Sequence, residues 1–193
     1  MRFAEGNIIV ICLLFPMAAF GSSFPDVSGF YQTNSFPVPS YPALVEMGES
    51  VNLGDFGFTN VTAGSSSFVF EESSDCLVRS IGSGDAFRIQ ARMGDSFSAA
   101  TSFMISRFSM MSSTHPLPGL DSSVAAIGDI AYTGWKTNIV SSLFFVRNNV
   151  FVRIRSDNQN LSALPLAQHI DDALHFFSTN NMADPGGGGT IFP

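Results

Sequence analysis

Charged residues, and cations above all, are scarce in this sequence of 193 residues. Only 13% of the residues are charged, and nine Lys and Arg are outnumbered by 16 Asp and Glu, which gives a formal net charge of −7. Sequence-independent binding to nucleic acid depends on cations that neutralise phosphates. The composition therefore argues against nucleic acid as a partner.

Cysteine is equally scarce, and the positions of the two cysteines limit the covalent chemistry. Cys12 lies in an amino-terminal apolar stretch, whereas Cys76 lies in the body of the chain. If the amino-terminal stretch is removed, Cys76 stands alone and no internal disulfide can form. We expect Cys76 to be a small buried strand residue rather than a nucleophile, because no electropositive helix start stands beside it.

The amino-terminal segment Met1–Ser23 has the layout of a secretory signal peptide. Arg2 lies near its start, an apolar run covers residues 8–15, a proline breaks the run and small residues follow. The run is too short for a membrane span, which needs ~20 apolar residues. We expect cleavage after Gly21, or else after Ser23. The protein would then be secreted, either extracellular or periplasmic, and would meet the membrane only through its signal peptide. The alternatives are an uncleaved anchor and a buried amino-terminal element.

Composition divides the rest of the chain into three parts. Residues 24–48 are rich in proline and aromatics and predict an extended arm, either draped on the domain or loosely ordered. Residues 49–179 predict a single domain, and residues 180–193, with four successive glycines, predict a flexible tail. Asn60 and Asn160 match the glycosylation acceptor pattern, which matters only in a eukaryotic secretory pathway.

Alternation of apolar and polar residues predicts strands. It extends over Ala86–Met93, and residues 76–81 predict the antiparallel partner of this strand. The clearest pattern is Ser142–Arg155, a hairpin that turns at Asn148–Asn149, because asparagine tolerates the positive φ of a tight turn. The resulting register pairs Phe145 with Val152 and gathers the aliphatic residues on one core face. A slip of one residue would mix the two faces.

Two segments switch to helical spacing. Residues 95–111 carry an apolar stripe, with Asp95 or Ser96 as the N-cap. Residues 161–177 carry a second stripe and are expected to turn Asp171 and the other polar residues toward solvent. Further short strands complete the order β-β-β-α-β-β-β-α. We expect an α+β fold, an antiparallel sheet of about five to six strands with both helices packed on one face.

Three segments carry a resemblance to a known group of domains. They are Gly128–Tyr132, which reads G-D-I-A-Y, the hairpin Leu143–Ile154, and Leu164–Leu174. Together they resemble small exported bacterial sensor-like and lipoprotein domains of unknown function, of the PsbP/Mog1-like fold group. The resemblance implies an α+β domain with a central antiparallel sheet and carries no catalytic residue across. The chain departs from the group at Asn148, where a glycine is usual, and lacks both a lipidation motif and paired cysteines.

Motifs that frame an active site are absent. Neither G-x-S-x-G nor H-E-x-x-H occurs, so we assign no catalytic residue and no cofactor. His169, Asp172 and His175 stand three apart on the last predicted helix and could approach one metal ion, with His115 as a further ligand. The alternative interpretation is a solvated polar face opposite the apolar stripe.

Arginines concentrate on the predicted strands. Six of the eight cations that follow the predicted signal peptide are strand arginines. If the two hairpins are neighbours, their outer face carries a basic cluster with phenylalanines between the arginines. Such a surface suits an anionic ligand or a partner protein. The alternative is an ordinary solvated face whose arginines pair with acidic neighbours. The candidate binding residues are Arg88, Arg92, Arg153, Arg155, Phe144 and Phe151.

These observations favour a secreted, non-enzymatic domain that binds an unknown protein or an anionic ligand. One alternative is a small exported enzyme, hydrolytic or metal-assisted, built around His169 and His175. Another is a structural component of the cell surface, for which the abundance of glycine, serine and phenylalanine gives some support.

Overall fold

The computed structural model describes residues 39–41, 43–61, 63–109, 124–134 and 138–180. The predicted signal peptide, most of the arm, His115 and the tail beyond Asn180 lie outside the described residues. The predictions made for those parts of the chain therefore stay predictions.

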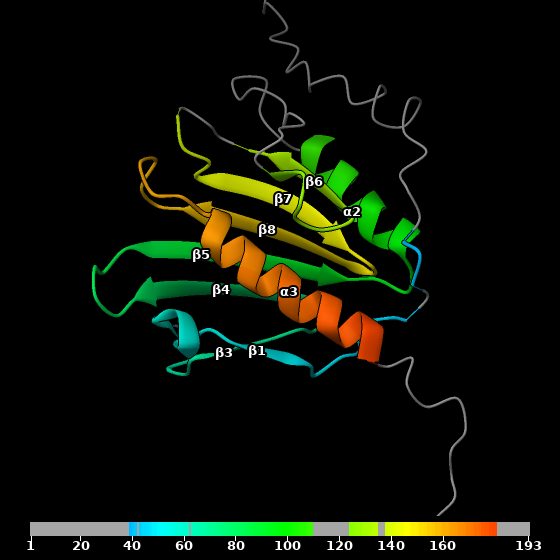
Figure 1. Ribbon diagram of the computed structural model, residues 1–193, viewed down its shortest axis with the longest axis horizontal. Helices are drawn as coiled ribbons and strands as arrows, with labels where there is room; N and C mark the ends of the chain where they lie inside the picture. Colours follow the sequence, from blue (N-terminus) through cyan, green and yellow to red (C-terminus); the bar gives the residue numbers. More distant parts are fainter. Residues whose placement is uncertain (1–38, 42, 62, 110–123, 135–137, 181–193) are drawn as a thin grey trace, which may run out of the picture.

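An antiparallel sheet of six strands forms the centre of the described structure, in the order β2-β4-β5-β8-β7-β6 (Figure 1). A separate small sheet pairs β1 with β3. The strands are β1 Ser50–Asn52, β2 Phe58–Asn60, β3 Ser67–Val69, β4 Ser73–Ser80, β5 Ala86–Met93, β6 Ile130–Thr133, β7 Ser142–Arg147 and β8 Val150–Ser156. The helices are α2 Phe97–Ser109 and α3 Leu164–Asn180, and η1 Gly54–Phe56 is a 3-10 helix. The predicted α+β class is confirmed.

The hairpin β7–β8 has the register that its turn residues predict. Phe145 lies opposite Val152, and Leu143 lies opposite Ile154. Asn148 takes a φ of 50°, the left-handed conformation that a tight turn requires. Because side chains alternate across a strand, the hairpin presents two different faces. One is largely apolar, and the other carries apolar residues at the turn end and Arg153 and Arg155 farther along β8.

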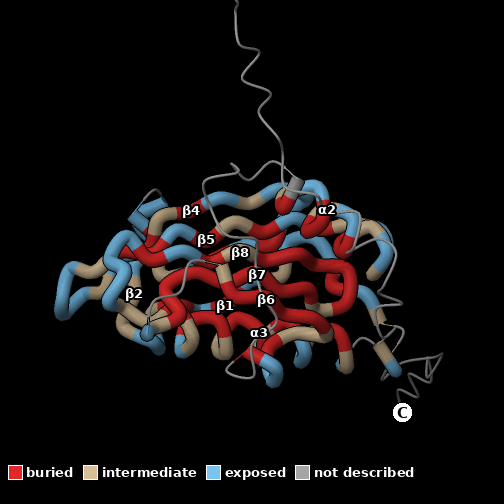
Figure 2. Tube along the Cα trace, turned by 90° about the horizontal axis from the view of Figure 1, so that it is seen from above, coloured by how far each residue is buried: buried red, intermediate tan, exposed pale blue. Residues whose placement is uncertain are grey.

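One of these faces packs against α3 and the small sheet. Leu166, Ile170 and Leu174 of α3 join a single core with residues of β5, β7 and β8, such as Ile89 and Phe145. Figure 1 shows α3 lying across the sheet with β1 and β3 beside it. Figure 2 shows that the central strands carry most of the buried chain.

The other face packs against α2, so the expectation that both helices cover one face is wrong. Met104 and Phe108 of α2 form a second core with residues from β6, β7 and β8. The ring of Phe108 meets those of Tyr132 and Phe144 edge-on at 5.4 and 5.2 Å. The physical reason is the hairpin itself, because Phe144 and Phe151 point away from the α3 face and need a cover of their own.

Helix α2 has a defined start and ends with a cation. The Oγ of Ser96 accepts the backbone N–H of Ala99 at 3.2 Å, which identifies Ser96 as the N-cap. Arg107 stands in the last turn, where a positive charge interacts favourably with the free carbonyls of the helix end. The last turn of α2 thereby places Arg107 beside the arginines of the sheet.

The turn of the β7–β8 hairpin also holds the described end of the arm. The side-chain amide of Asn149 accepts the N–H of Val45 at 2.8 Å and donates to its carbonyl at 3.1 Å. The Nδ2 of Asn148 donates to the carbonyl of Ala43. The chain before β1 is therefore fixed to the turn by hydrogen bonds of both asparagines.

A buried ion-pair network joins β7 to α3. Arg147 donates from Nε and Nη2 to the two carboxylate oxygens of Asp171, at 2.7 and 2.6 Å. Its Nη1 donates to Asp129 and to the hydroxyl of Tyr41, both at 3.0 Å. Asp171 is only 1% exposed, so the expectation that it faces solvent is wrong. Burial of this carboxylate is compensated by the bidentate contact with Arg147.

The two glycosylation patterns differ in access. Asn60 is 7% exposed in β2, and its Oδ1 accepts the N–H of Ala63. Asn160 is exposed in the connection between β8 and α3. Only Asn160 therefore offers an accessible amide.

Candidate functional site

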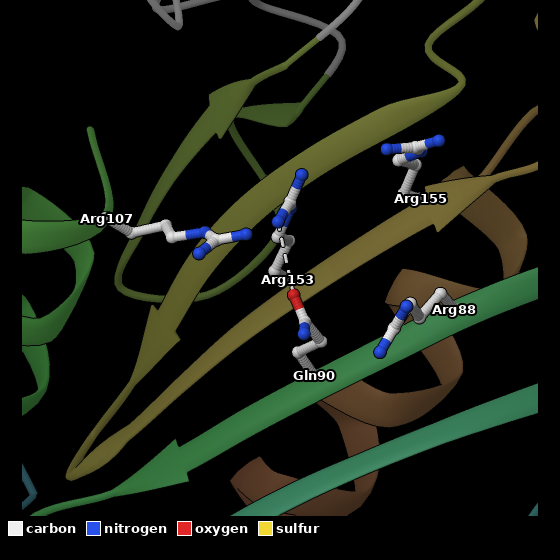
Figure 3. A pocket seen from close by; sticks show the side chains of 5 residues that line it. All are labelled: Arg88, Gln90, Arg107, Arg153 and Arg155. Atoms are coloured by element: carbon white, nitrogen blue, oxygen red, sulfur yellow. Dashed lines mark hydrogen bonds between the residues drawn. The ribbon is translucent and has the colours of Figure 1, made fainter. Parts of the chain in front are cut away.

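Four arginines gather on the α2 face of the sheet (Figure 3). Arg88 of β5 lies opposite Arg155 of β8, and Gln90 of β5 lies opposite Arg153 of β8. Arg107 reaches toward Arg153 from the last turn of α2. These five residues line a hollow of about 280 Å³, which we call the arginine hollow.

Strand geometry brings these side chains together. Residues two apart on a strand share a face, so Arg88 joins Gln90, and Arg153 joins Arg155. The Cβ atoms of directly opposite residues lie only ~4.5–5.5 Å apart, and like charges in opposite positions are destabilising. The pairing of Arg88 with Arg155 thus works against the stability of the sheet.

Arg153 is the most constrained cation of the arginine hollow. Its Nη1 donates to Oε1 of Gln90 at 3.1 Å, and its guanidinium lies over the ring of Phe144, 5.4 Å from the centroid. Its Nε is buried and has no hydrogen-bond partner among the described residues. Burial, followed by repulsion from the other three arginines, lowers the pKa of Arg153 to about 10. A positive charge is therefore held where its surroundings disfavour it.

Among the residues that the structure describes, one carboxylate is hydrogen-bonded to side chains of the arginine hollow, that of Asp75 in β4. Arg88 donates from Nε and Nη2 to its two oxygens at 2.9 and 2.8 Å, and Nε2 of Gln90 donates to it at 2.8 Å. Gln90 thus turns its nitrogen to Asp75 and its oxygen to Arg153. Hydrogen bonding from Arg88 lowers the pKa of the Asp75 carboxyl, which keeps it ionised.

The charge balance of the arginine hollow favours an anion. Among the described residues, four guanidinium groups stand against one hydrogen-bonded carboxylate, that of Asp75, on a chain whose net charge is −7. Guanidinium groups do not lose their proton near neutral pH. The lining side chains are arginines and a glutamine, so they supply neither a nucleophile nor a general base. The arrangement can bind and orient an anionic group.

The structure brings together three of the six candidate binding residues, namely the arginines at 88, 153 and 155. Arg92 stands apart, with its guanidinium 4.2 Å from the centroid of the Phe103 ring. Phe144 and Phe151 are 1% and 7% exposed beneath α2 and present no surface to a partner. The ring of Phe144 instead lies under the guanidinium of Arg153, which it contacts by a cation–π interaction.

Three residues of the site were not predicted. Gln90 lies between Arg88 and Arg92 on the polar face of β5, so the alternation pattern could have found it. Prediction of Asp75 would have required the register of β4 against β5. Prediction of Arg107 as a site residue would have required knowing that α2 packs on this face of the sheet. No local sequence pattern indicates that packing.

The candidate metal ligands of α3 make separate contacts. Nε2 of His169 lies 2.9 Å from the carbonyl oxygen of Asn52. The ring of His175 meets that of Tyr41 edge-on at 5.3 Å, and Asp172 accepts a hydrogen bond from its own helix. Among the residues that the structure describes, no group of three His, Cys, Asp or Glu could hold a metal ion.

Cys76 lies on the face of β4 that packs into the core, where it is buried. Burial, together with the nearby charge of Asp75, raises the pKa of its thiol to about 12. The thiolate is the reactive form of cysteine, so this side chain serves packing rather than nucleophilic chemistry.

Comparison with known protein families, with curated proteins and with solved structures finds no match to this chain. The resemblance to exported bacterial sensor-like and lipoprotein domains stays a prediction. In the part of the chain that the structure describes, no helix has the length and apolar character needed to cross a membrane. The arginine hollow is therefore the feature of the described structure that points to a function.

Proposed function

We propose that this chain is a secreted, non-enzymatic binding domain that recognises an anionic group in the arginine hollow. The gathering of four guanidinium groups against one carboxylate carries this proposal. Crowding of like charges does not stabilise a fold, and Arg153 keeps its charge despite burial. Binding of a negatively charged ligand accounts for this clustering of arginines, whereas packing within the fold does not.

Export is the second part of the proposal, and the layout of Met1–Ser23 supports it. The same layout predicts that the arginine hollow meets its ligand outside the cytoplasm. The resemblance to exported bacterial domains points in the same direction.

The anion site is tested by titrating the full chain with tripolyphosphate in low-salt buffer, where electrostatic binding is least screened. We expect Arg153→Gln to weaken binding by about tenfold or more, because one charge-assisted hydrogen bond contributes ~1.5–3 kcal/mol. Arg79→Gln is the matched control, since Arg79 is an exposed strand arginine outside the hollow. Absence of binding, or an equal loss in both variants, would contradict the proposal.

A further inference from the structure

The arginine hollow offers hydrogen-bond donors almost exclusively. Arginine has five N–H donors and no acceptor. The one side-chain acceptor among the lining residues is Oε1 of Gln90, and it already accepts from Arg153. The amide nitrogen of Gln90 is held by Asp75, which fixes this orientation. A ligand that only accepts hydrogen bonds therefore matches the described lining, whereas a ligand that must donate finds among these side chains only the second lone pair of that one amide oxygen.

The guanidinium groups approach the hollow from three different elements. Arg88 comes from β5, Arg153 and Arg155 come from β8, and Arg107 comes from α2 (Figure 3). One guanidinium fork matches the two oxygens of a planar carboxylate, as Arg88 matches those of Asp75, which accept one further hydrogen bond from Gln90. A tetrahedral oxyanion presents oxygens in several directions and can receive several forks at once.

Charge and size agree with that geometry. Among the described residues, the hollow has three more guanidinium groups than hydrogen-bonded carboxylates, so a ligand with two negative charges compensates more of the excess than a ligand with one. Its volume of about 280 Å³ lies just below the ~300–1,000 Å³ usual for small-molecule pockets. This volume suits a compact group, or the end of a small molecule, rather than a long polymer segment.

We infer that the arginine hollow is selective for a compact tetrahedral dianion, namely sulfate, inorganic phosphate or the phosphate of a small monoester. This inference rests on the proposed function of the hollow as an anion site. It goes further by excluding carboxylates, phosphodiesters and sulfate esters, whose single charge leaves more of the arginine excess uncompensated.

The ligand's own protonation gives a sharp test. A phosphate monoester loses its second proton with a pKa of ~6 and is acceptor-only in the dianionic form. The described charged groups at the hollow are the arginines of β5, β8 and α2 together with Asp75 of β4. The carboxylate of Asp157, which follows β8, also interacts with the charge of Arg88. The described lining contains no histidine. Between pH 5 and pH 7.5 the charge of these groups stays constant, so a change in affinity over this range reports the ligand.

The experiment is calorimetric titration of the full chain with phenyl phosphate, inorganic phosphate, sulfate, dimethyl phosphate and acetate at pH 7.5 and pH 5.0. We expect the three dianions to bind at pH 7.5 at least tenfold more tightly than dimethyl phosphate and acetate. Phenyl phosphate should weaken about tenfold at pH 5.0, where only ~10% of it is dianionic, while the affinity for sulfate stays constant. The affinities of phenyl phosphate, inorganic phosphate and sulfate then identify which source of the dianion fits best.

Two variants tie the binding to the arginine hollow. Arg153→Gln and Arg107→Gln should each lower the affinity for sulfate by about tenfold or more, and Arg79→Gln should leave it unchanged. Arg107 lies on the surface of a helix, so its replacement reports binding even if Arg153→Gln disturbs the fold. Equal affinity for acetate and sulfate would overturn the selectivity for a dianion and leave the proposed anion site standing. Failure of every anion to bind, tripolyphosphate included, would overturn both.

Discussion

Replacement of Arg153 by methionine should separate binding from stability. The pKa of Arg153 falls from its ordinary value of ~12.5 to about 10, chiefly because the side chain is buried. That difference corresponds to ~3 kcal/mol of unfavourable interaction with the charged form. Since the side chain is only partly buried and solvent screens its charge, we take ~1 kcal/mol as the realistic magnitude.

Methionine keeps an unbranched apolar side chain at this position while removing the charge and the unpartnered Nε. We therefore expect Arg153→Met to raise the free energy of unfolding by ~1 kcal/mol in anion-free buffer. The sign follows from linkage, because a cation with a lowered folded-state pKa destabilises the fold at every pH below that pKa. The destabilisation is relieved only as the pH rises through about 10, so a measurement at pH 7 captures all of it.

Urea unfolding in the absence of phosphate and sulfate is the assay, with the midpoint and slope compared between the parent chain and the variant. Arg88→Met is the matched control, since Arg88 is exposed and its pair with Asp75 contributes only ~0–1 kcal/mol. A loss of 2 kcal/mol or more in Arg153→Met would identify Arg153 as a structural residue and refute the reasoning that it is maintained for binding.

Three further predictions concern Asp171, Gln90 and Cys76. Asp171→Asn should lower the free energy of unfolding by ~3–5 kcal/mol in a urea titration, because it breaks a buried ion pair and leaves Arg147 partly unpaired; a loss below 1 kcal/mol would contradict the buried network. Gln90→Glu should weaken sulfate binding at least tenfold in calorimetry, since its carboxylate would pair with Arg153 inside the hollow; unchanged affinity would place the ligand elsewhere. Cys76 should react with a thiol reagent only when the chain is unfolded, because burial raises the pKa of its thiol to about 12; rapid labelling of the native protein would argue against its buried position.

Local patterns predicted the strands and helices because their causes are local. The alternation over Ala86–Met93 and the turn at Asn148 depend on neighbours in sequence, and both are confirmed. The face on which each helix packs depends on residues far apart in the chain. The placement of α2 follows from Phe144 and Phe151 together, whose joint apolar surface exists only once β7 and β8 are paired.

The candidate site shows the same division. Arg88, Arg153 and Arg155 were found from strand alternation, because the two hairpins are indeed neighbours in the sheet. The role predicted for Phe144 at the surface was wrong, since α2 buries this ring. Arg107 also lines the site, but its place there depends on how α2 packs on the sheet, which is a tertiary contact.

The most direct test of the arginine hollow is an NMR titration that observes the Nε–H groups of the arginine side chains while sulfate is added to the full chain. The resonance of Arg153, assigned by its loss in Arg153→Met, should shift most, because this side chain lies among the other residues that line the hollow (Figure 3) and feels the charge of all three other arginines. The resonance of Arg79 should stay in place. An unchanged Arg153 resonance at saturating sulfate would contradict the account.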